Sequence, residues 1–148
     1  MSQRDLSEEE VYRVMQEILK DCKVCTLATE SDKKPWATTM FFAVEGLYIY
    51  CIIEDRGQGM SNLKKNPIVA LSIDNRTPDK FVQAVGMAEV VEGNEEVKGR
   101  RLVLERVPEY RPFFEMVTTS VVRITLKRVH ITDVPRGWFP AKVLRREK

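Results

Sequence analysis

The sequence has little of the side-chain chemistry that hydrolytic enzymes use. Its 148 residues include one histidine, His130, which lies in an alternating stretch typical of a strand. A Ser-His-Asp or Cys-His nucleophile would depend on this residue alone, and we interpret it instead as a partly exposed strand residue. The sequence also contains no Walker loop, no G-x-G-x-x-G that opens a helix after a strand, and no H-E-x-x-H. No hydrolytic or dinucleotide-binding site is therefore indicated by motif.

Charge and hydropathy argue against two further classes of partner. Lysine and arginine total 24 against 22 aspartate and glutamate residues, a net charge of +2, so nucleic acid is not indicated. No apolar run reaches the length of about 18 residues that a membrane span needs, and the polar N-terminus is unlike a signal peptide. We expect a cytoplasmic protein with no membrane or nucleic-acid partner.

Three cysteines, an odd number without an export signal, indicate reduced thiols rather than a disulfide framework. Cys22 and Cys25 form a C-x-x-C, but a structural zinc ion needs four ligands, and only Cys51 and His130 remain as candidates. A thioredoxin-type motif would open a helix after a strand, whereas here Cys22 ends an expected helix. We therefore predict buried structural thiols and no metal site.

Periodicity predicts a strand-rich chain with helices at intervals. Residues 7–22 have apolar residues at helical spacing, with Ser7 and Glu10 at the spacing of a capping box. Asn94 is the expected N-cap of a helix that continues to about Arg106. The expected strands cover residues 23–29, 36–44, 47–53, 68–73, 80–92 and 120–134, and further short helices cover about 60–66 and 110–116.

Six strands joined mainly by hairpins argue for a closed or nearly closed antiparallel barrel, because closure removes exposed strand edges. The expected fold class is all-β, or β-rich α+β, with a six-stranded antiparallel barrel and about three peripheral helices in a single domain, residues 1–148. Gly86 lies inside the strand at 80–92, where a glycine predicts a bulge, a bend or the close approach of another group.

The stretch from Leu47 to Leu71 combines a strand, a glycine-broken loop, a short helix and a second strand. Gly57 and Gly59 let the loop backbone lie close to a ligand, and the helix that follows offers free N–H groups to an anion. An ordinary connection without a ligand explains these local features equally well. The apolar strand residues beside the loop suit a ligand that is flat at one end and phosphorylated at the other.

Three segments together resemble the pyridoxamine 5′-phosphate oxidase-like family of FMN-binding split barrels. They are LATESDKKPWATTMFFAVEGLYIYC, SNLKKNPIVALSI and VQAVGMAEVVE, and the most specific part is Asn62, Leu63, Asn66 and Pro67. The resemblance covers about residues 8–134. It implies a six-stranded antiparallel split β-barrel, a homodimer, and FMN bound in two equivalent clefts at the dimer interface.

Carried onto this sequence, the resemblance places FMN beside the second and third strands, the glycine loop and a late aromatic residue. The Ser-Arg-Lys loop that holds the phosphate in the family falls on Gly57, Gln58 and Gly59, and the nearest substitute cation is Arg56. The candidate cofactor-binding residues are Thr38, Thr39, Met40, Tyr50, Cys51, Arg56, Gln58, Gly59, Met60, Asn62 and Trp138.

The missing cations leave three hypotheses open. The first is an FMN-dependent oxidoreductase, in which the cofactor carries the redox chemistry on a small-molecule substrate. The second is a split barrel that has lost FMN and binds a deazaflavin, haem or a nucleotide. The third is a dimeric binding protein without enzymatic activity.

Overall fold

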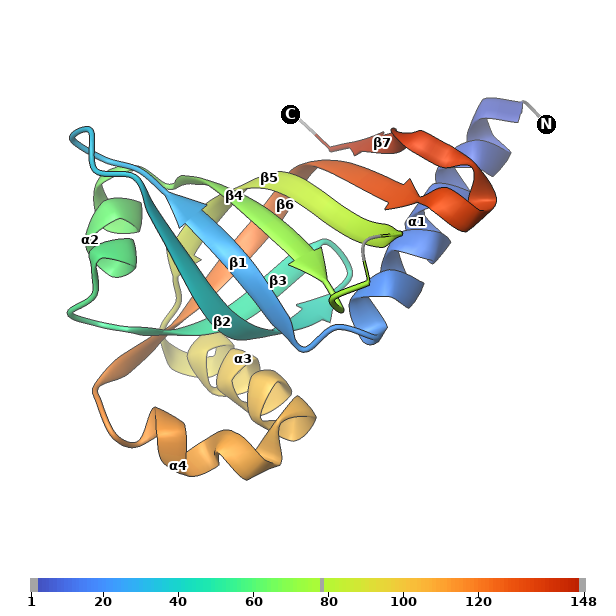
Figure 1. Ribbon diagram of the computed structural model, residues 1–148. Helices are drawn as coiled ribbons and strands as arrows, with labels where there is room; N and C mark the ends of the chain where they lie inside the picture. Colours follow the sequence, from blue (N-terminus) through green and yellow to red (C-terminus); the bar gives the residue numbers. More distant parts are fainter. Residues whose placement is uncertain (1–2, 78, 147–148) are drawn as a thin grey trace.

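A six-stranded antiparallel barrel forms the body of the protein (Figure 1). The computed structural model describes residues 3–77 and 79–146, with side chains from residue 8 onward. The barrel strands are β1 (Val24–Thr29), β2 (Trp36–Glu45), β3 (Tyr48–Glu54), β4 (Ile68–Asp74), β5 (Lys80–Val90) and β6 (Thr119–Asp133). This architecture confirms the predicted split barrel.

Strand order explains how the barrel closes. The neighbours follow the order β3-β2-β1-β4-β5-β6-β7, and β3 also pairs with β6 from Tyr48↔Thr125 to Glu54↔Thr119. The seventh strand, β7 (Trp138–Arg145), was not expected; among the described strands it pairs with β6 alone, along the C-terminal part of that strand. Its burial does not alternate, and Pro140 cannot donate to a strand ladder, so the sequence pattern of a strand is missing there.

Gly86 forms the expected bulge. The pairing of β5 with β6 shifts its register between Val85 and Gly86. A Cβ atom at Gly86 would lie 2.7 Å from the carbonyl oxygen of Thr125 and 2.8 Å from Cγ2 of Ile124. Both the bulge and the close approach of another group are therefore confirmed.

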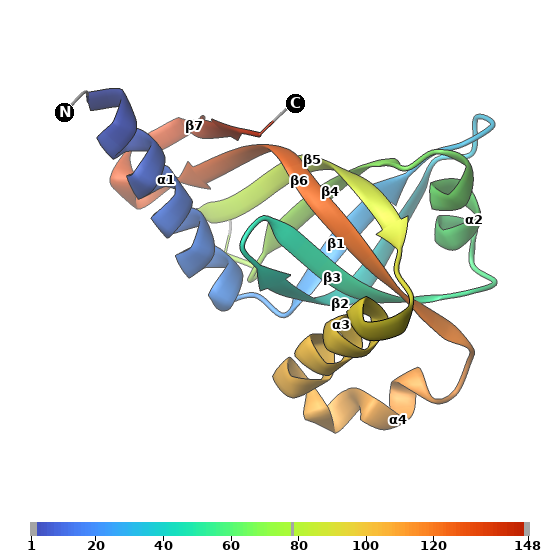
Figure 2. The same ribbon diagram turned by 180° about the vertical axis from the view of Figure 1, so that it is seen from behind.

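Helices occupy the two ends and one side of the barrel (Figures 1 and 2). The helix α1 (Gln3–Lys20) packs on β5 and β7, and α2 (Gln58–Lys65) packs on β1 and β2 at the opposite end. The helices α3 (Gly93–Arg106) and α4 (Arg111–Phe114) lie outside β2 and β3, with short 3-10 turns at Pro108–Tyr110 and Val134–Arg136. No helix in the described part of the chain has the length and apolar character to cross a membrane.

Two predicted helix starts were wrong. The helix α1 begins at Gln3, so Ser7 lies inside it; the residues before Ser7 include good helix formers, which extend the helix upstream. The N-cap of α3 is Glu92, without a side-chain cap, rather than Asn94. Gly93 takes a φ of +63°, and the helix begins two residues earlier than expected.

The apolar core has two parts. One fills the barrel interior, and the other lies outside the barrel between β3 and α3. Gly99 lets α3 approach the sheet, because a Cβ atom there would lie 2.6 Å from Cδ1 of Tyr50 and 2.7 Å from Cγ1 of Val121. The strand β3 is consequently buried on both of its faces.

Arg106, the last residue of α3, ties that helix to α1. Its guanidinium donates to the carbonyl oxygens of Leu19 and Lys20 at 3.3 Å each, to that of Cys22, and to that of Phe42 at 2.9 Å. Its Cζ also lies 5.0 Å from the centroid of the Phe42 ring. The last carbonyls of a helix lack intrahelical partners, so Arg106 caps α1 from a neighbouring helix.

Candidate functional site

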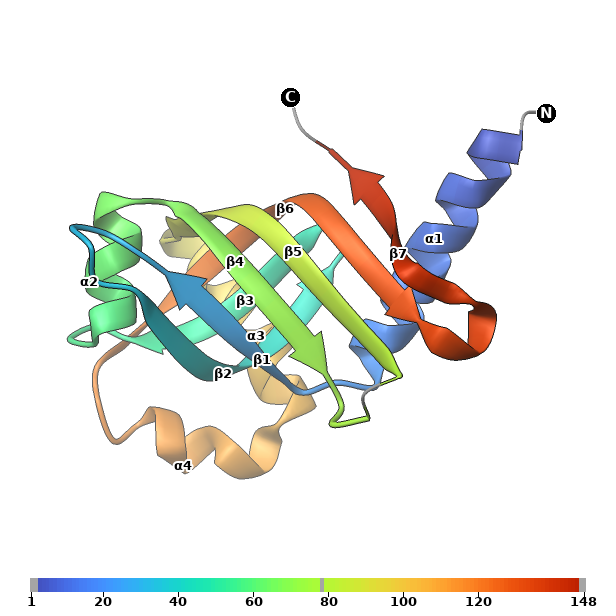
Figure 3. The ribbon, with the colours of Figure 1, turned by 45° about the horizontal axis from the view of Figure 1, so that its top comes forward.

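A mainly apolar groove of about 460 Å³ lies against β2, between the N-terminus of α2 and the short helix α4. Figure 3 shows β2 running between these two helices. The groove is lined by residues of β1, β2, β3, α2 and α4 and of the loop before α2: Val24, Trp36, Thr38, Thr39, Met40, Phe41, Ile52, Ile53, Glu54, Gly57, Gln58, Gly59, Met60, Phe113 and Phe114.

The N-terminus of α2 opens onto this groove without a side-chain cap. Gly57 is the N-cap residue, with extended backbone angles (φ −79°, ψ 161°), and the first turn contains no acidic residue. The first N–H groups of a helix have no intrahelical acceptor, and here no side chain replaces one. These amides, together with the helix dipole, favour an anionic group at this end of the groove.

Thr38 and Gly59 meet at the same place. The hydroxyl oxygen of Thr38 is buried and has no hydrogen-bond partner among the described residues. A Cβ atom at Gly59 would lie only 2.8 Å from that oxygen, so glycine is needed for α2 to begin so close to β2. A buried hydroxyl without a partner is uncommon, and this one lies beside the uncapped amides.

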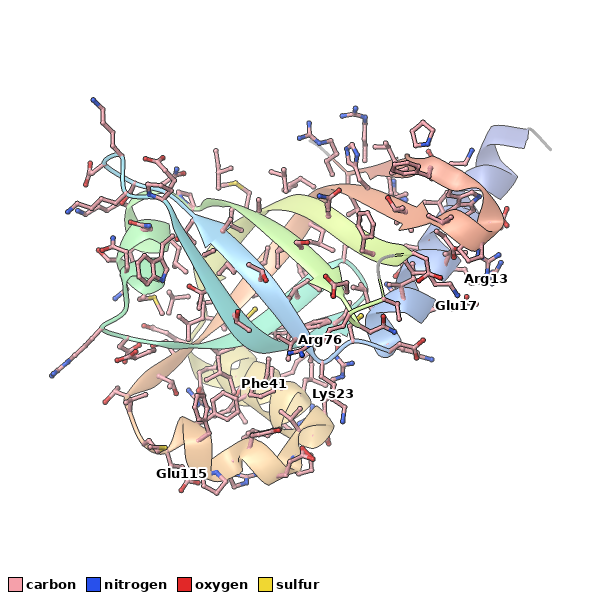
Figure 4. All side chains as sticks on the ribbon, viewed as in Figure 1. Arg13, Glu17, Lys23, Phe41, Arg76 and Glu115 are labelled. Carbon is pink, nitrogen blue, oxygen red and sulfur yellow. The ribbon has the colours of Figure 1, made fainter. Side chains whose placement is uncertain are left out.

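Aromatic rings form the opposite wall. Phe41 stacks on Tyr110 at a centroid distance of 4.7 Å and meets Phe114 edge-on at 5.8 Å. In Figure 4 the Phe41 side chain lies on the side of β2 that faces α3 and α4. Phe113 packs on Phe114 but keeps 60% of its surface exposed. A flat apolar ligand would cover this exposed ring surface.

Asn62 holds the wall opposite the aromatic rings in place. Its carbonyl oxygen accepts from the Ser31 hydroxyl and the Gln58 amide, both at 2.8 Å. Its amide donates to the Thr29 hydroxyl at 3.2 Å and to the Lys34 carbonyl at 2.7 Å. Asn62 is fully buried, so it fixes α2 and Gln58 against the β1–β2 loop and does not itself line the groove.

Among the described residues that line the groove, one has a carboxylate side chain and none has a cationic side chain. Glu54 lies at its rim, is exposed, and forms no ion pair with another described residue. Arg56 is exposed and lies outside the lining set. The groove therefore suits an apolar ring, and the donors that its described lining offers to an anion are uncharged, among them the α2 backbone amides and the Thr38 hydroxyl.

Six of the candidate cofactor-binding residues come together in the groove, and five lie elsewhere. Those that line it are Thr38, Thr39, Met40, Gln58, Gly59 and Met60. Besides Arg56 and Asn62, the residues outside are Tyr50, Cys51 and Trp138. The aromatic wall was missed as part of the site because residues 110–116 were interpreted only as a short helix.

Tyr50 lies under α3 rather than beside the groove. Its hydroxyl donates to a carboxylate oxygen of Glu95 at 2.9 Å, and the same oxygen accepts from Arg123 at 3.1 Å. Burial and then the hydrogen bond to Glu95 raise the pKa of Tyr50, while the bond from Tyr50 lowers that of Glu95. This side chain anchors α3 to the sheet.

Trp138 lies at the start of β7 and packs into the core of its own chain. Its ring centroid is 5.8 Å from the guanidinium carbon of Arg136, which pairs with Asp133 at 3.0 Å. The groove lies at the other end of the barrel, where α2 is found (Figure 1). Within one chain, Trp138 therefore contributes to the core and not to the groove.

The three cysteines are buried and free, as expected. Burial, followed by the charges of Asp74 and Asp21, raises the pKa of the Cys22 thiol to about 11. The pKa of Cys51 is raised by its hydrogen bond with Cys25 and by burial. In the described part of the chain, no group of three or more histidine, cysteine, aspartate or glutamate side chains could hold a metal ion.

We predict that Cys22 and Cys51 do not react with a thiol reagent at neutral pH until the protein unfolds, because the thiolate is the nucleophile and the pKa of both thiols is raised. The unfolded Cys22 thiol ionises near pH 9.0 and the folded one only near 11, so its contribution to stability is complete below pH 9.0 and is lost as the pH rises towards 11. Timed labelling and alkaline denaturation check both statements. Rapid labelling of the native protein at neutral pH would contradict them.

Comparison with known proteins agrees with this fold. Residues 13–133 match the family model described as pyridoxamine 5′-phosphate oxidase. The fold resembles that of the heme binding protein from Mycobacterium smegmatis, with a TM-score of 0.77 at 22% identity. The match covers 91% of this chain but 57% of that protein, so this chain spans a little over half its length.

Two further solved structures share the fold. A FAD-binding protein from Mesorhizobium loti matches with a TM-score of 0.67 at 18% identity, over 79% of this chain and 88% of that one. A conserved hypothetical protein from Mycobacterium tuberculosis matches with a TM-score of 0.66 at 27% identity, over 90% and 85%. No match was found among curated protein sequences. Because residues 13–133 of the 148 fit one family model, this chain belongs to the pyridoxamine 5′-phosphate oxidase family.

Proposed function

We propose that this chain binds FMN in the groove beside β2 and acts as a flavin-dependent oxidoreductase on a small-molecule substrate. The observation that carries the proposal is the meeting of the uncapped α2 N-terminus with the unpartnered Thr38 hydroxyl at one end of an apolar groove. An anion at that end satisfies both groups, and an attached flat ring covers the apolar walls. Membership of the family supports a flavin as that ligand.

The residues divide between the two ends of such a ligand. The backbone amides of Gln58, Gly59 and Met60 and the Thr38 hydroxyl would hold the phosphate, and Met40 and the Phe113 ring would contact the flavin. When bound, the flavin supplies the redox chemistry, and the protein supplies position and electrostatics. Arg56 stays a candidate phosphate ligand, and Arg56→Ala tests it by FMN titration.

The affinity for the phosphate should respond to a new cation at Gly57. Its φ of −79° suits any residue, and a Cβ atom there would meet only Glu54 atoms at 3.8 and 3.9 Å. We expect Gly57→Lys to tighten FMN binding about tenfold, or about 1.4 kcal/mol. The measurement is a titration followed by flavin fluorescence.

Two controls separate charge from contact. Gly57→Gln has a long uncharged side chain and should leave the FMN affinity near that of the parent. Riboflavin lacks the phosphate, so Gly57→Lys should not tighten its binding. If riboflavin gained as much as FMN, the phosphate would not lie at the α2 N-terminus; if the parent bound neither ligand, the proposed function would be wrong.

A second candidate is an uncharged planar ligand, which the lining of the groove favours. No lysine, arginine or histidine is among the described lining residues, and Glu54 stands at the rim. Such a site would bind riboflavin at least as tightly as FMN. The same pair of titrations on the parent protein therefore decides between the two candidates.

A further inference from the structure

A hollow of about 400 Å³ lies on the outer face of β1, β4, β5 and β6, apart from the groove. Figures 1 and 3 show no helix over this face. Its volume lies within the range of small-molecule sites, about 300–1,000 Å³. Among the described residues that line the hollow there is no aspartate or glutamate, whereas Arg128 and His130 are both present. The hollow therefore has room for a small ligand and no carboxylate to repel an anion.

A row of polar side chains crosses the hollow from strand to strand. The register pairs Thr26 with Ser72, Ser72 with Gln83, and Gln83 with His130, so the four residues lie side by side on one face of the sheet. In the described part of the chain, none of these four side chains has a hydrogen-bond partner. The polar row therefore offers two hydroxyls, an amide and an imidazole to a ligand.

A second row, two residues away along each strand, is apolar and ends at an arginine. It consists of Ala28, Ala70 and Val85, followed by Arg128. Ala28 and Ala70 are exposed, and their small side chains leave the sheet surface flat. From Ala70 on β4 to Arg128 on β6 the distance is two strand spacings, roughly 10 Å. A flat ring over the alanines would thus place a group attached to it near the guanidinium.

Arg128 lacks an acidic partner and faces another arginine. Its side chain is partly buried, its Nε has no hydrogen-bond acceptor, and no described residue forms an ion pair with it. The register places Arg145 of β7 directly opposite, and like charges in that position are destabilising. An anion beside the two residues would offset this repulsion and accept from Nε. Guanidinium groups grip a phosphate through paired hydrogen bonds.

Positive charge is concentrated in the same ladder. Residues 127–131 of β6 face residues 142–146, and these ten positions hold five lysine or arginine residues and no aspartate or glutamate. The whole chain has a net charge of only +2, so the local excess is offset elsewhere in the sequence. A local excess of one sign raises the concentration of oppositely charged ligands.

We propose that the hollow binds a nucleoside monophosphate. Its phosphate pairs with Arg128, its sugar hydroxyls bond to the polar row at Gln83 and His130, and its base lies over Ala70. A doubly charged phosphate matches the two facing guanidinium groups, and a planar base matches the flat apolar row. This site goes beyond the proposed function, because it shares no lining residue with the groove.

Calorimetric titration of the parent protein tests the ligand class. AMP or UMP should bind, and the matching nucleoside and inorganic phosphate should each bind at least tenfold more weakly, since each lacks one half of the contacts. Absence of binding by both nucleotides at about 1 mM overturns the proposal. A nucleoside that binds as tightly as its nucleotide does so too, and so does phosphate alone, because the hollow would then hold a bare anion only.

Two variants separate the phosphate contact from the contact with the base. Arg128→Ala should weaken binding of the nucleotide about tenfold and leave the nucleoside nearly unchanged. Ala70→Phe fills the apolar row and should weaken both. Arg101→Ala removes an exposed arginine of α3 and is the matched control for net charge. If Arg128→Ala fails to fold, Arg128→Gln repeats the test with a longer side chain. Unchanged nucleotide affinity in the folded variant overturns the assignment of Arg128.

FMN is also a phosphate monoester of a planar molecule, so the two sites must be told apart. Gly57→Trp fills the groove and should leave nucleotide binding in the hollow unchanged, and AMP should not displace FMN from the parent. Loss of nucleotide binding in Gly57→Trp would place the nucleotide in the groove and overturn the proposal. A parent that binds a nucleotide but neither FMN nor riboflavin would contradict the proposed function and leave the nucleotide site standing.

Discussion

Replacing Asn62 with alanine is expected to lower the free energy of unfolding by about 3 kcal/mol, because a buried group that loses its partner costs about 1–3 kcal/mol. This one side chain makes four hydrogen bonds. It accepts from Ser31 and Gln58 and donates to Thr29 and Lys34. Some of these groups regain water after the change, so the loss is smaller than four separate penalties. Urea denaturation measures it.

Asn62→Ala should weaken ligand binding in the groove as well as lower the free energy of unfolding. The amide of Gln58 would lose its acceptor on Asn62, and Gln58 begins α2 and lines the groove. We therefore expect Asn62→Ala to weaken flavin binding by about tenfold even where the protein is fully folded. Ligand titration well below the denaturation midpoint separates this loss from unfolding.

Two variants make the expectation specific. Ser61→Ala changes the exposed neighbour on α2 and should shift stability by no more than about 0.5 kcal/mol. Ser31→Ala removes one partner, and the double variant with Asn62→Ala should cost less than the sum of the single changes, since the two side chains share a bond. Full additivity would mean that the bond between them contributes nothing.

Strand positions could be predicted because alternation reports burial directly. The strand β1 alternates between exposed and buried residues along its whole length, and so does β4. The bulge at Gly86 was predictable for a related reason, because a glycine weakens the interior of a strand and is typical of a bulge or of a close approach. These signals are local, so they can be recognised without knowing which strands or helices pack against the segment.

Tyr50 shows why part of the candidate site was not predictable. The strand β3 is buried from Ile49 to Ile53, so the sequence does not say which face meets the barrel interior and which meets a helix. Only the packing of α3, made possible by Gly99, shows that Tyr50 lies under that helix and does not line the groove. The position of Phe113 likewise depends on where the chain returns after α3, which no periodicity encodes.

Arg106→Ala is the second change with a large expected effect. We expect it to lower the free energy of unfolding by about 3 kcal/mol. Each hydrogen bond to a charged group contributes about 1.5–3 kcal/mol, and water that bonds to the freed carbonyl oxygens recovers part of the total. The guanidinium joins α1, α3 and β2 through four carbonyl oxygens. Removing it leaves the end of α1 uncapped and exposes the Phe42 ring that it covers.

A lysine at this position keeps the charge but not the planar fork that reaches several carbonyls at once. We expect Arg106→Lys to recover less than half of the loss and Arg101→Ala, on the exposed side of the same helix, to change stability by no more than about 0.5 kcal/mol. Hydrogen exchange should locate the damage in the last turn of α1 rather than at the groove. If Arg106→Lys were as stable as the parent, charge alone would hold α1 to α3, and the bonds to the individual carbonyls would be dispensable.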